Sequence, residues 1–224
     1  MEEMTVKEEA KRIPYGMMNF VAVREDNCYY VDKTRYIEKV EKANKYFFFI
    51  RPRRFGKSLT LSMLRHYYDI NQTDKFDRLY GDLYIGKHPT PNHNKYLIIY
   101  LNFAVVNADL GNYRSALDAH CRTEFTILCD RYSSLLPSNL KENLMKEDGA
   151  VKQLDILYKV ANEVGLKIYL FIDEYDHFTN HILSDAARLN EYKGETHGTG
   201  YLRTFFDTIK AGTDSSIERV FITG

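Results

Sequence analysis

The residue types that could do chemistry gather first in a short basic loop. Residues 51–58 read RPRRFGKS and end in Gly56, Lys57 and Ser58. The loop follows an apolar run at 45–50 that predicts a strand, and precedes a run with apolar side chains at helical spacing as far as Tyr68. A turn at a helix N-terminus presents unpaired N–H groups and the positive end of the helix dipole. This context favours a phosphate-binding loop.

Each residue of the loop would contribute separately to binding a nucleoside triphosphate. Gly56 lets the backbone approach the phosphates, the Lys57 ammonium places a charge on the terminal phosphates, and the Ser58 hydroxyl can coordinate Mg²⁺. The rest of the predicted cradle comprises Arg53, Arg54, Phe55 and Leu59. The motif GxxxxGK[S/T] is imperfect, because Arg51 stands at the first glycine position. A charged turn that only caps a helix is the alternative reading of the loop alone.

A second motif places two acids directly after a buried strand. Residues 168–174 read IYLFIDE, so Asp173 and Glu174 follow a continuous apolar run. An aspartate at the carboxyl end of a parallel strand can hold magnesium or its waters. The adjacent glutamate can polarise the water that attacks the γ-phosphate. Acid pairs also occur as plain loop caps, but the loop and the acids in this order favour an ATP-hydrolysing site.

Other residues leave two interpretations open. The run 220–223 ends in Thr223, which would either sense the γ-phosphate or be an ordinary strand-end threonine. Arg51, Arg53 and Arg54 would either contact phosphates, of a nucleotide or of DNA, or pair with acids elsewhere in the chain. Aromatic residues at 29, 30 and 47–49 would either stack on adenine or belong to the core.

The elements that must position these residues alternate along the chain. Short continuous apolar runs predict buried strands at 45–50, 96–103, 167–172 and 219–223. Helical patterns separate them at 113–135, 151–164 and 201–211, and residues 82–95 have the composition of a loop. This alternation predicts an α/β fold with a mostly parallel sheet flanked by helices. We expect one domain over residues 1–224, with a helical lead-in at 1–44 and an incomplete core at 45–224.

Composition excludes several other classes of protein. Lys plus Arg and Asp plus Glu both number 31, so no basic surplus indicates a constitutive nucleic-acid binder. The three cysteines form no CxxC pair, which argues against a disulfide framework or a zinc ribbon and favours reduced thiols. The N-terminus has no apolar segment, and the longest apolar runs are far shorter than the roughly 20 residues that span a bilayer. We therefore expect a cytoplasmic protein with no membrane partner.

Four motifs together resemble the bacterial AAA-ATPase-like family. They are YVDKT at 30–34, RPRRFGKSL at 51–59, FIDEYD at 171–176 and VFITG at 220–224. The resemblance runs from about residue 12 to residue 224, and an arginine at the first glycine position is usual in this family. It implies a P-loop ATPase of the ASCE or AAA-like class, with an extra strand between the two motif strands, a catalytic glutamate, and ATP and Mg²⁺ as ligands.

The resemblance also carries expectations about what surrounds the site. Members commonly have a C-terminal restriction-endonuclease-like nuclease domain, which these residues do not contain, and are thought to act on nucleic acid or in defence or mobile elements. A nucleic-acid partner would then bind through that domain, and oligomers are an option. If the strands lie in the sheet in the order second, third, fourth, first, the strand at 45–50 lies at an edge. Its missing neighbour would come from sequence downstream. We thus expect the chain to stop within its domain.

The leading hypothesis is an ATP-hydrolysing module. A nucleotide-gated switch with negligible turnover is its first rival. A P-loop kinase acting on a small molecule is the second rival, and the acid pair at 173–174 argues against it.

Overall fold

The centre of the molecule is a four-stranded sheet in which all neighbouring strands are parallel. The computed structural model describes residues 10–52, 54–106, 113–176 and 200–224. The strands are β1 (Tyr46–Phe49), β2 (Tyr96–Asn102), β3 (Lys167–Asp173) and β4 (Ile217–Thr223). Their order is β1-β4-β3-β2, so β4 lies between the strands that carry the two motifs. This is the expected order, and all four predicted strands are confirmed.

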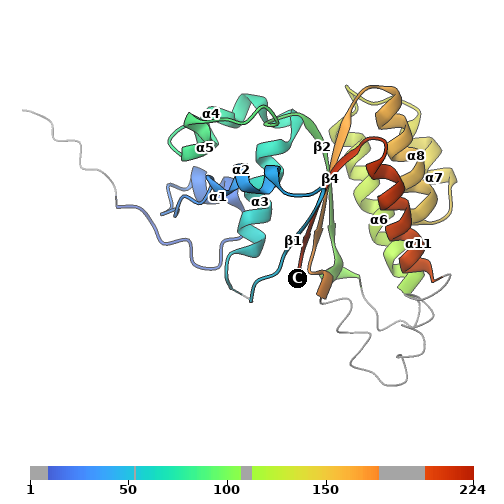
Figure 1. Cartoon of the computed structure of the whole chain (residues 1–224), viewed down its shortest axis with the longest axis horizontal. Helices are drawn as coiled ribbons and strands as arrows, with labels where there is room; N and C mark the ends of the chain where they lie inside the picture. The colour runs from blue at the N-terminus through green and yellow to red at the C-terminus, as the bar shows by residue number, and fades with distance from the viewer. Residues whose placement is uncertain (1–9, 53, 107–112, 177–199) are drawn as a thin grey trace, which may run out of the picture.

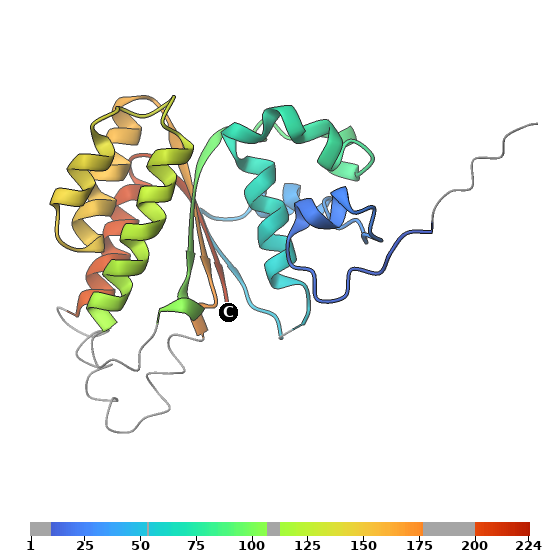
Figure 2. The same ribbon diagram turned by 180° about the vertical axis from the view of Figure 1, so that it is seen from behind.

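Helices cover both faces of the sheet, as Figure 1 and the reverse view in Figure 2 show. One face carries α1 (Phe20–Glu25), α2 (Tyr36–Lys42), α3 (Lys57–Tyr68), α4 (Phe76–Tyr80) and α5 (Tyr84–Lys87). The other carries α6 (Tyr113–Arg131), α7 (Leu140–Lys146), α8 (Ala150–Glu163) and α11 (Tyr201–Thr213). Two short 3₁₀ segments complete the described elements, at Ile70–Lys75 and Phe103–Val105.

Each of the central strands is buried on both faces, because its side chains alternate between two cores. On β3, Tyr169 and Phe171 pack toward α3 in an aromatic cluster, whereas Leu170 and Ile172 pack toward α6, α8 and α11 in a largely aliphatic one. A strand with two covered faces has no polar side, which explains the continuous apolar runs of the sequence.

The structure corrects the sequence-based expectation in three places. The strand at 45–50 is not buried throughout, because its side chains alternate between the two faces: Phe47 and Phe49 pack against the aromatic core, whereas Phe48 on the opposite face is 58% exposed. The presumed loop at 82–95 contains the short helix α5. The long helix predicted to residue 135 ends at Arg131.

Two further findings concern the class of protein. No helix in the described ranges is long and apolar enough to cross a membrane. The three cysteines, Cys28, Cys121 and Cys129, are all buried and free.

Candidate functional site

The loop between β1 and α3 turns sharply before the helix begins. Gly56 is the residue before α3 and has a left-handed backbone with φ of 77°. Glycine adopts this conformation without the cost of about 1 kcal/mol or more that other residues incur. A Cβ on Gly56 would meet no atom within 4 Å, so open space adjoins the loop at this point. Arg53 lies outside the described residues.

Lys57 and Ser58 form the first turn of α3, at the helix end where backbone N–H groups are free to bind an anion. The Lys57 side chain is only 6% exposed, and its Nζ lies 4.0 Å from Oε1 of Glu174. Thr60, one turn on, donates its hydroxyl to the carbonyl oxygen of Gly56 at 2.9 Å and so supports the turn. The chain thus holds a buried cation beside the second motif.

Strand register brings the ends of the motif strands to one edge of the sheet. Phe49 pairs with Thr223, and Asn102 pairs with Asp173, each at the last position of its strand. The carboxyl ends of parallel strands are where open α/β sheets bind ligands. The C-terminal residue Gly224 lies at this edge (Figure 1), where its carbonyl accepts a hydrogen bond from the Arg51 backbone at 3.3 Å.

Asp173 is 3% exposed and accepts hydrogen bonds from three segments. Its Oδ2 accepts from the Tyr100 hydroxyl at 3.1 Å, and its Oδ1 accepts from the Glu174 backbone N–H at 3.0 Å. The Thr223 hydroxyl donates to the same Oδ1. Hydrogen bonds from three directions fix the orientation of this buried carboxyl group.

Glu174 adopts an unusual backbone conformation. Its φ is 54°, in the left-handed region that residues with a Cβ rarely occupy, at a cost of the order of 1–3 kcal/mol. Its N–H also lies 3.4 Å from the Thr223 hydroxyl oxygen. The turn gives Glu174 a partly exposed side chain beside Lys57, while Asp173 stays buried.

The structure therefore brings together four of the residues proposed from the sequence: Lys57, Asp173, Glu174 and Thr223. Arg54 and Phe55 lie in the same loop and are exposed, and Leu59 packs against the aromatic core. In the described ranges neither Arg51 nor Arg54 makes a salt bridge, so pairing with acids finds no support there. Arg51 instead lies over the Phe49 ring, at 5.8 Å from its centroid.

Three of the five aromatic residues considered for adenine are partly buried and pack against the aromatic core. Phe47 and Phe49 pack against Phe221, with ring centroids 5.2 and 6.0 Å away. Tyr30 makes an edge contact with Phe20 at 5.3 Å. Tyr29 and Phe48 are exposed, so both interpretations of these two residues stay open.

The donor set fits Mg²⁺ bound together with a nucleotide. No group of three or more His, Cys, Asp or Glu in the described part of the chain could hold a metal alone. Mg²⁺ usually takes one or two protein oxygens and completes its shell with waters and phosphates. One hydroxyl, from Ser58, and one oriented carboxylate, from Asp173, are consistent with that pattern.

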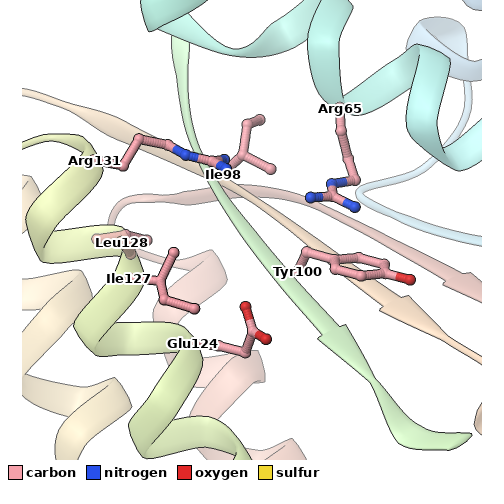
Figure 3. Close-up of a pocket in the computed structure, with 7 residues that line it drawn as sticks. All are labelled: Arg65, Ile98, Tyr100, Glu124, Ile127, Leu128 and Arg131. Carbon is pink, nitrogen blue, oxygen red and sulfur yellow. The ribbon is translucent and has the colours of Figure 1, made fainter. Parts of the chain in front are cut away.

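A small pocket lies between α3, α6 and the outer edge of β2 (Figure 3). Its cavity volume of about 20 Å³ suits one water molecule and is too small for a nucleotide. Its lining includes Arg65, Tyr100, Glu124 and Arg131. Arg65 reaches from α3 toward the ring of Tyr100.

Tyr100 and Arg65 are the site residues that sequence reasoning missed. The Arg65 guanidinium lies 3.8 Å from the centroid of the Tyr100 ring, and the Tyr100 hydroxyl reaches Asp173. The available signal was a hydroxyl-bearing residue near the end of an otherwise aliphatic run at 97–101. No spacing rule links that position to Asp173, because the strands are adjacent only in the folded sheet.

The fold and the site define an α/β protein with a parallel sheet compatible with a P-loop fold. The model of a family described as predicted AAA-ATPase matches residues 14–224. The chain belongs to this AAA-ATPase-like family, which implies nucleotide binding.

One relative extends the comparison. A protein of Azotobacter chroococcum mcd 1, named as an uncharacterized protein in the vnfD 5′ region, is 41% identical over 63 residues. The match covers 28% of this chain and 12% of that relative. No solved structure matches the chain at a significant level.

Proposed function

We propose that this chain binds ATP with Mg²⁺ and hydrolyses it. The observation that supports this most directly is the convergence of Lys57 and Glu174, 4.0 Å apart, beside the hydrogen-bonded Asp173. Lys57 begins α3, Asp173 ends β3 and Glu174 follows it, so an ammonium group and two carboxyl groups lie at the same edge of the sheet. Membership of the AAA-ATPase-like family supports the same activity.

The residues divide the chemistry among them. The loop backbone through Gly56 and the Lys57 ammonium would bind the phosphates and offset charge as the terminal P–O bond breaks. Ser58 and Asp173 would hold Mg²⁺, which supplies further charge neutralisation when bound. Glu174 would accept a proton from the attacking water. Thr223 would orient Asp173 through its hydroxyl, and would contact the γ-phosphate only by exchanging that hydrogen bond, because a hydroxyl has one proton to donate.

Two substitutions test this assignment. Lys57→Ala should abolish ATP binding, because it removes the buried ammonium. Glu174→Gln should retain binding and lower kcat by about 10²–10⁴-fold, because the amide cannot take the proton. Glutamine has a Cβ, as glutamate does, so the left-handed backbone at this position stays equally strained. Glycine would relieve that strain and so change the backbone as well as the side chain.

The measurements are binding of a fluorescent ATP analogue and release of phosphate, each with and without DNA. The DNA arm tests the nucleic-acid-related role implied by the family resemblance. Glu163→Gln, an exposed position at the end of α8, is the matched control and should behave as wild type. Hydrolysis by Glu174→Gln at the wild-type rate would show that the base is assigned wrongly.

A nucleotide-gated switch is the second candidate, and the contact between Lys57 and Glu174 favours it. A phosphate group would compete with the Glu174 carboxylate for the Lys57 ammonium, so nucleotide binding would release Glu174. Tight ATP binding with very slow turnover would identify the switch. Phosphate release without any acceptor would exclude a small-molecule kinase.

A further inference from the structure

The Asp173 carboxylate has little freedom to move. An ionised carboxylate has about four acceptor positions, and three protein donors already use three of them. Two of the donors, the Glu174 N–H and the Thr223 hydroxyl, bind Oδ1. Within the described residues, the Tyr100 hydroxyl is the one donor to Oδ2. That hydroxyl therefore determines where the second oxygen points.

The register of the sheet explains how Tyr100 reaches Asp173. Tyr100 pairs with Phe171, and Asp173 lies two residues further along β3 on the same face. A tyrosine side chain is long enough to cross this diagonal to the neighbouring strand.

Arg65 holds the ring of Tyr100 from the other side. Its guanidinium lies 3.8 Å from the ring centroid, in the geometry of a cation–π contact. Its Nε is buried and has no hydrogen-bond partner in the described part of the chain. Arg65 lies eight residues after Lys57 on α3, about 12 Å along the helix. One helix thus carries both the phosphate-facing lysine and the residue that covers the ring.

We infer that Tyr100 is a positioning residue for the magnesium site. Its hydroxyl orients the Asp173 carboxylate toward the metal, and Arg65 on α3 keeps the ring in place. This inference rests on the proposed function and adds to it a connection between the phosphate loop and the metal-binding carboxylate through α3. Tyr100 is not a catalytic residue, because it acts on the site through Asp173.

The test is Tyr100→Phe in the whole chain, since phenylalanine keeps the ring and its contact with Arg65. The Mg²⁺ concentration that half-saturates binding of a non-hydrolysable ATP analogue should rise about tenfold or more, the usual effect of losing such a hydrogen bond. Affinity for the analogue without Mg²⁺ should stay unchanged. Tyr96→Phe is the matched control, because it removes a buried hydroxyl from the same face of β2, away from Asp173, and should leave the Mg²⁺ titration unchanged.

A second variant tests the contact with the ring. Arg65→Met keeps a long apolar stem but removes the guanidinium, and should shift the Mg²⁺ titration in the same direction by a smaller factor. The inference would be overturned if the wild type bound ATP and the Mg²⁺ titration of Tyr100→Phe coincided with that of Tyr96→Phe. Failure of the wild type to bind the analogue with Mg²⁺ would overturn the proposed function as well, so the two failures are distinguishable.

Discussion

At the scale of single residues, Thr223 connects the two acids of the site. It is fully buried, donates its hydroxyl to Asp173, and lies within 3.4 Å of the Glu174 N–H. The sequence alone left this residue either as a sensor of the γ-phosphate or as an ordinary threonine at a strand end. Asp173 accepts the one proton of the hydroxyl in this structure, so contact with a phosphate would require that hydrogen bond to break.

We predict that Thr223→Val lowers the free energy of unfolding by about 1–3 kcal/mol, because the buried Asp173 loses a donor and no apolar group can replace it. Thr223→Ser keeps the hydroxyl and should lose less. Urea denaturation of the two variants and the wild type measures the difference. Equal stability of the valine and serine variants would contradict this role for the hydroxyl.

At the scale of elements, the four strands are not equivalent. β4 and β3 are paired on both sides and covered on both faces, whereas β1 and β2 are the two edge strands. Phe221 on β4 is 1% exposed and packs against Phe47, Phe49 and Phe171. Phe48, on the neighbouring strand, is 58% exposed. Phe221 and Phe48 therefore differ in how much apolar surface folding removes from water.

Phe221→Ala should lower the free energy of unfolding by about 3–5 kcal/mol, because it leaves a cavity among packed rings. Phe48→Ala should cost less than about 1 kcal/mol, because the side chain is largely in water already. Chemical denaturation of both variants gives the comparison. A cost of several kcal/mol for Phe48→Ala would mean that this face of β1 is covered in solution.

At the scale of the whole molecule, one sheet separates an aromatic core from an aliphatic one. Cys121 and Cys129 lie on α6 in the aliphatic core. Burial raises the pKa of the Cys121 thiol well above its usual range, and burial followed by the nearby Asp130 raises that of Cys129 to about 11. Only the thiolate is nucleophilic, so both residues should report on the opening of this core.

We predict that Cys121 resists alkylation by iodoacetamide at pH 8 in the folded protein and reacts readily in denaturant. The rate for Cys129 should rise about tenfold for each pH unit between 7 and 9, because a group with a pKa of about 11 is almost wholly protonated there. Mass spectrometry of the modified peptides measures both rates. Rapid labelling of Cys121 in the native protein would contradict a closed core.

Local pattern was sufficient to predict most of the elements. The apolar runs gave the four strands, since strands covered on both faces need no polar side. The sequence RPRRFGKS, followed by helical spacing, indicated a loop before a helix, and the structure places Gly56 in a left-handed turn there. The helices α1, α4, α5 and α7 were not predicted, because each is seven residues or shorter and depends on packing more than on periodicity.

The sequence by itself determined the order of the motifs, the residue types at the ends of the strands and the alternation that makes an α/β sheet. Only the tertiary structure decided that Tyr100 reaches Asp173, that Arg65 covers the Tyr100 ring and that Lys57 lies beside Glu174. These contacts join residues 35 to 117 positions apart across strands and helices, and strand order and register bring them together. Periodicity depends on residues that are close along the chain, whereas the order and register of the strands determine which distant residues are close in space.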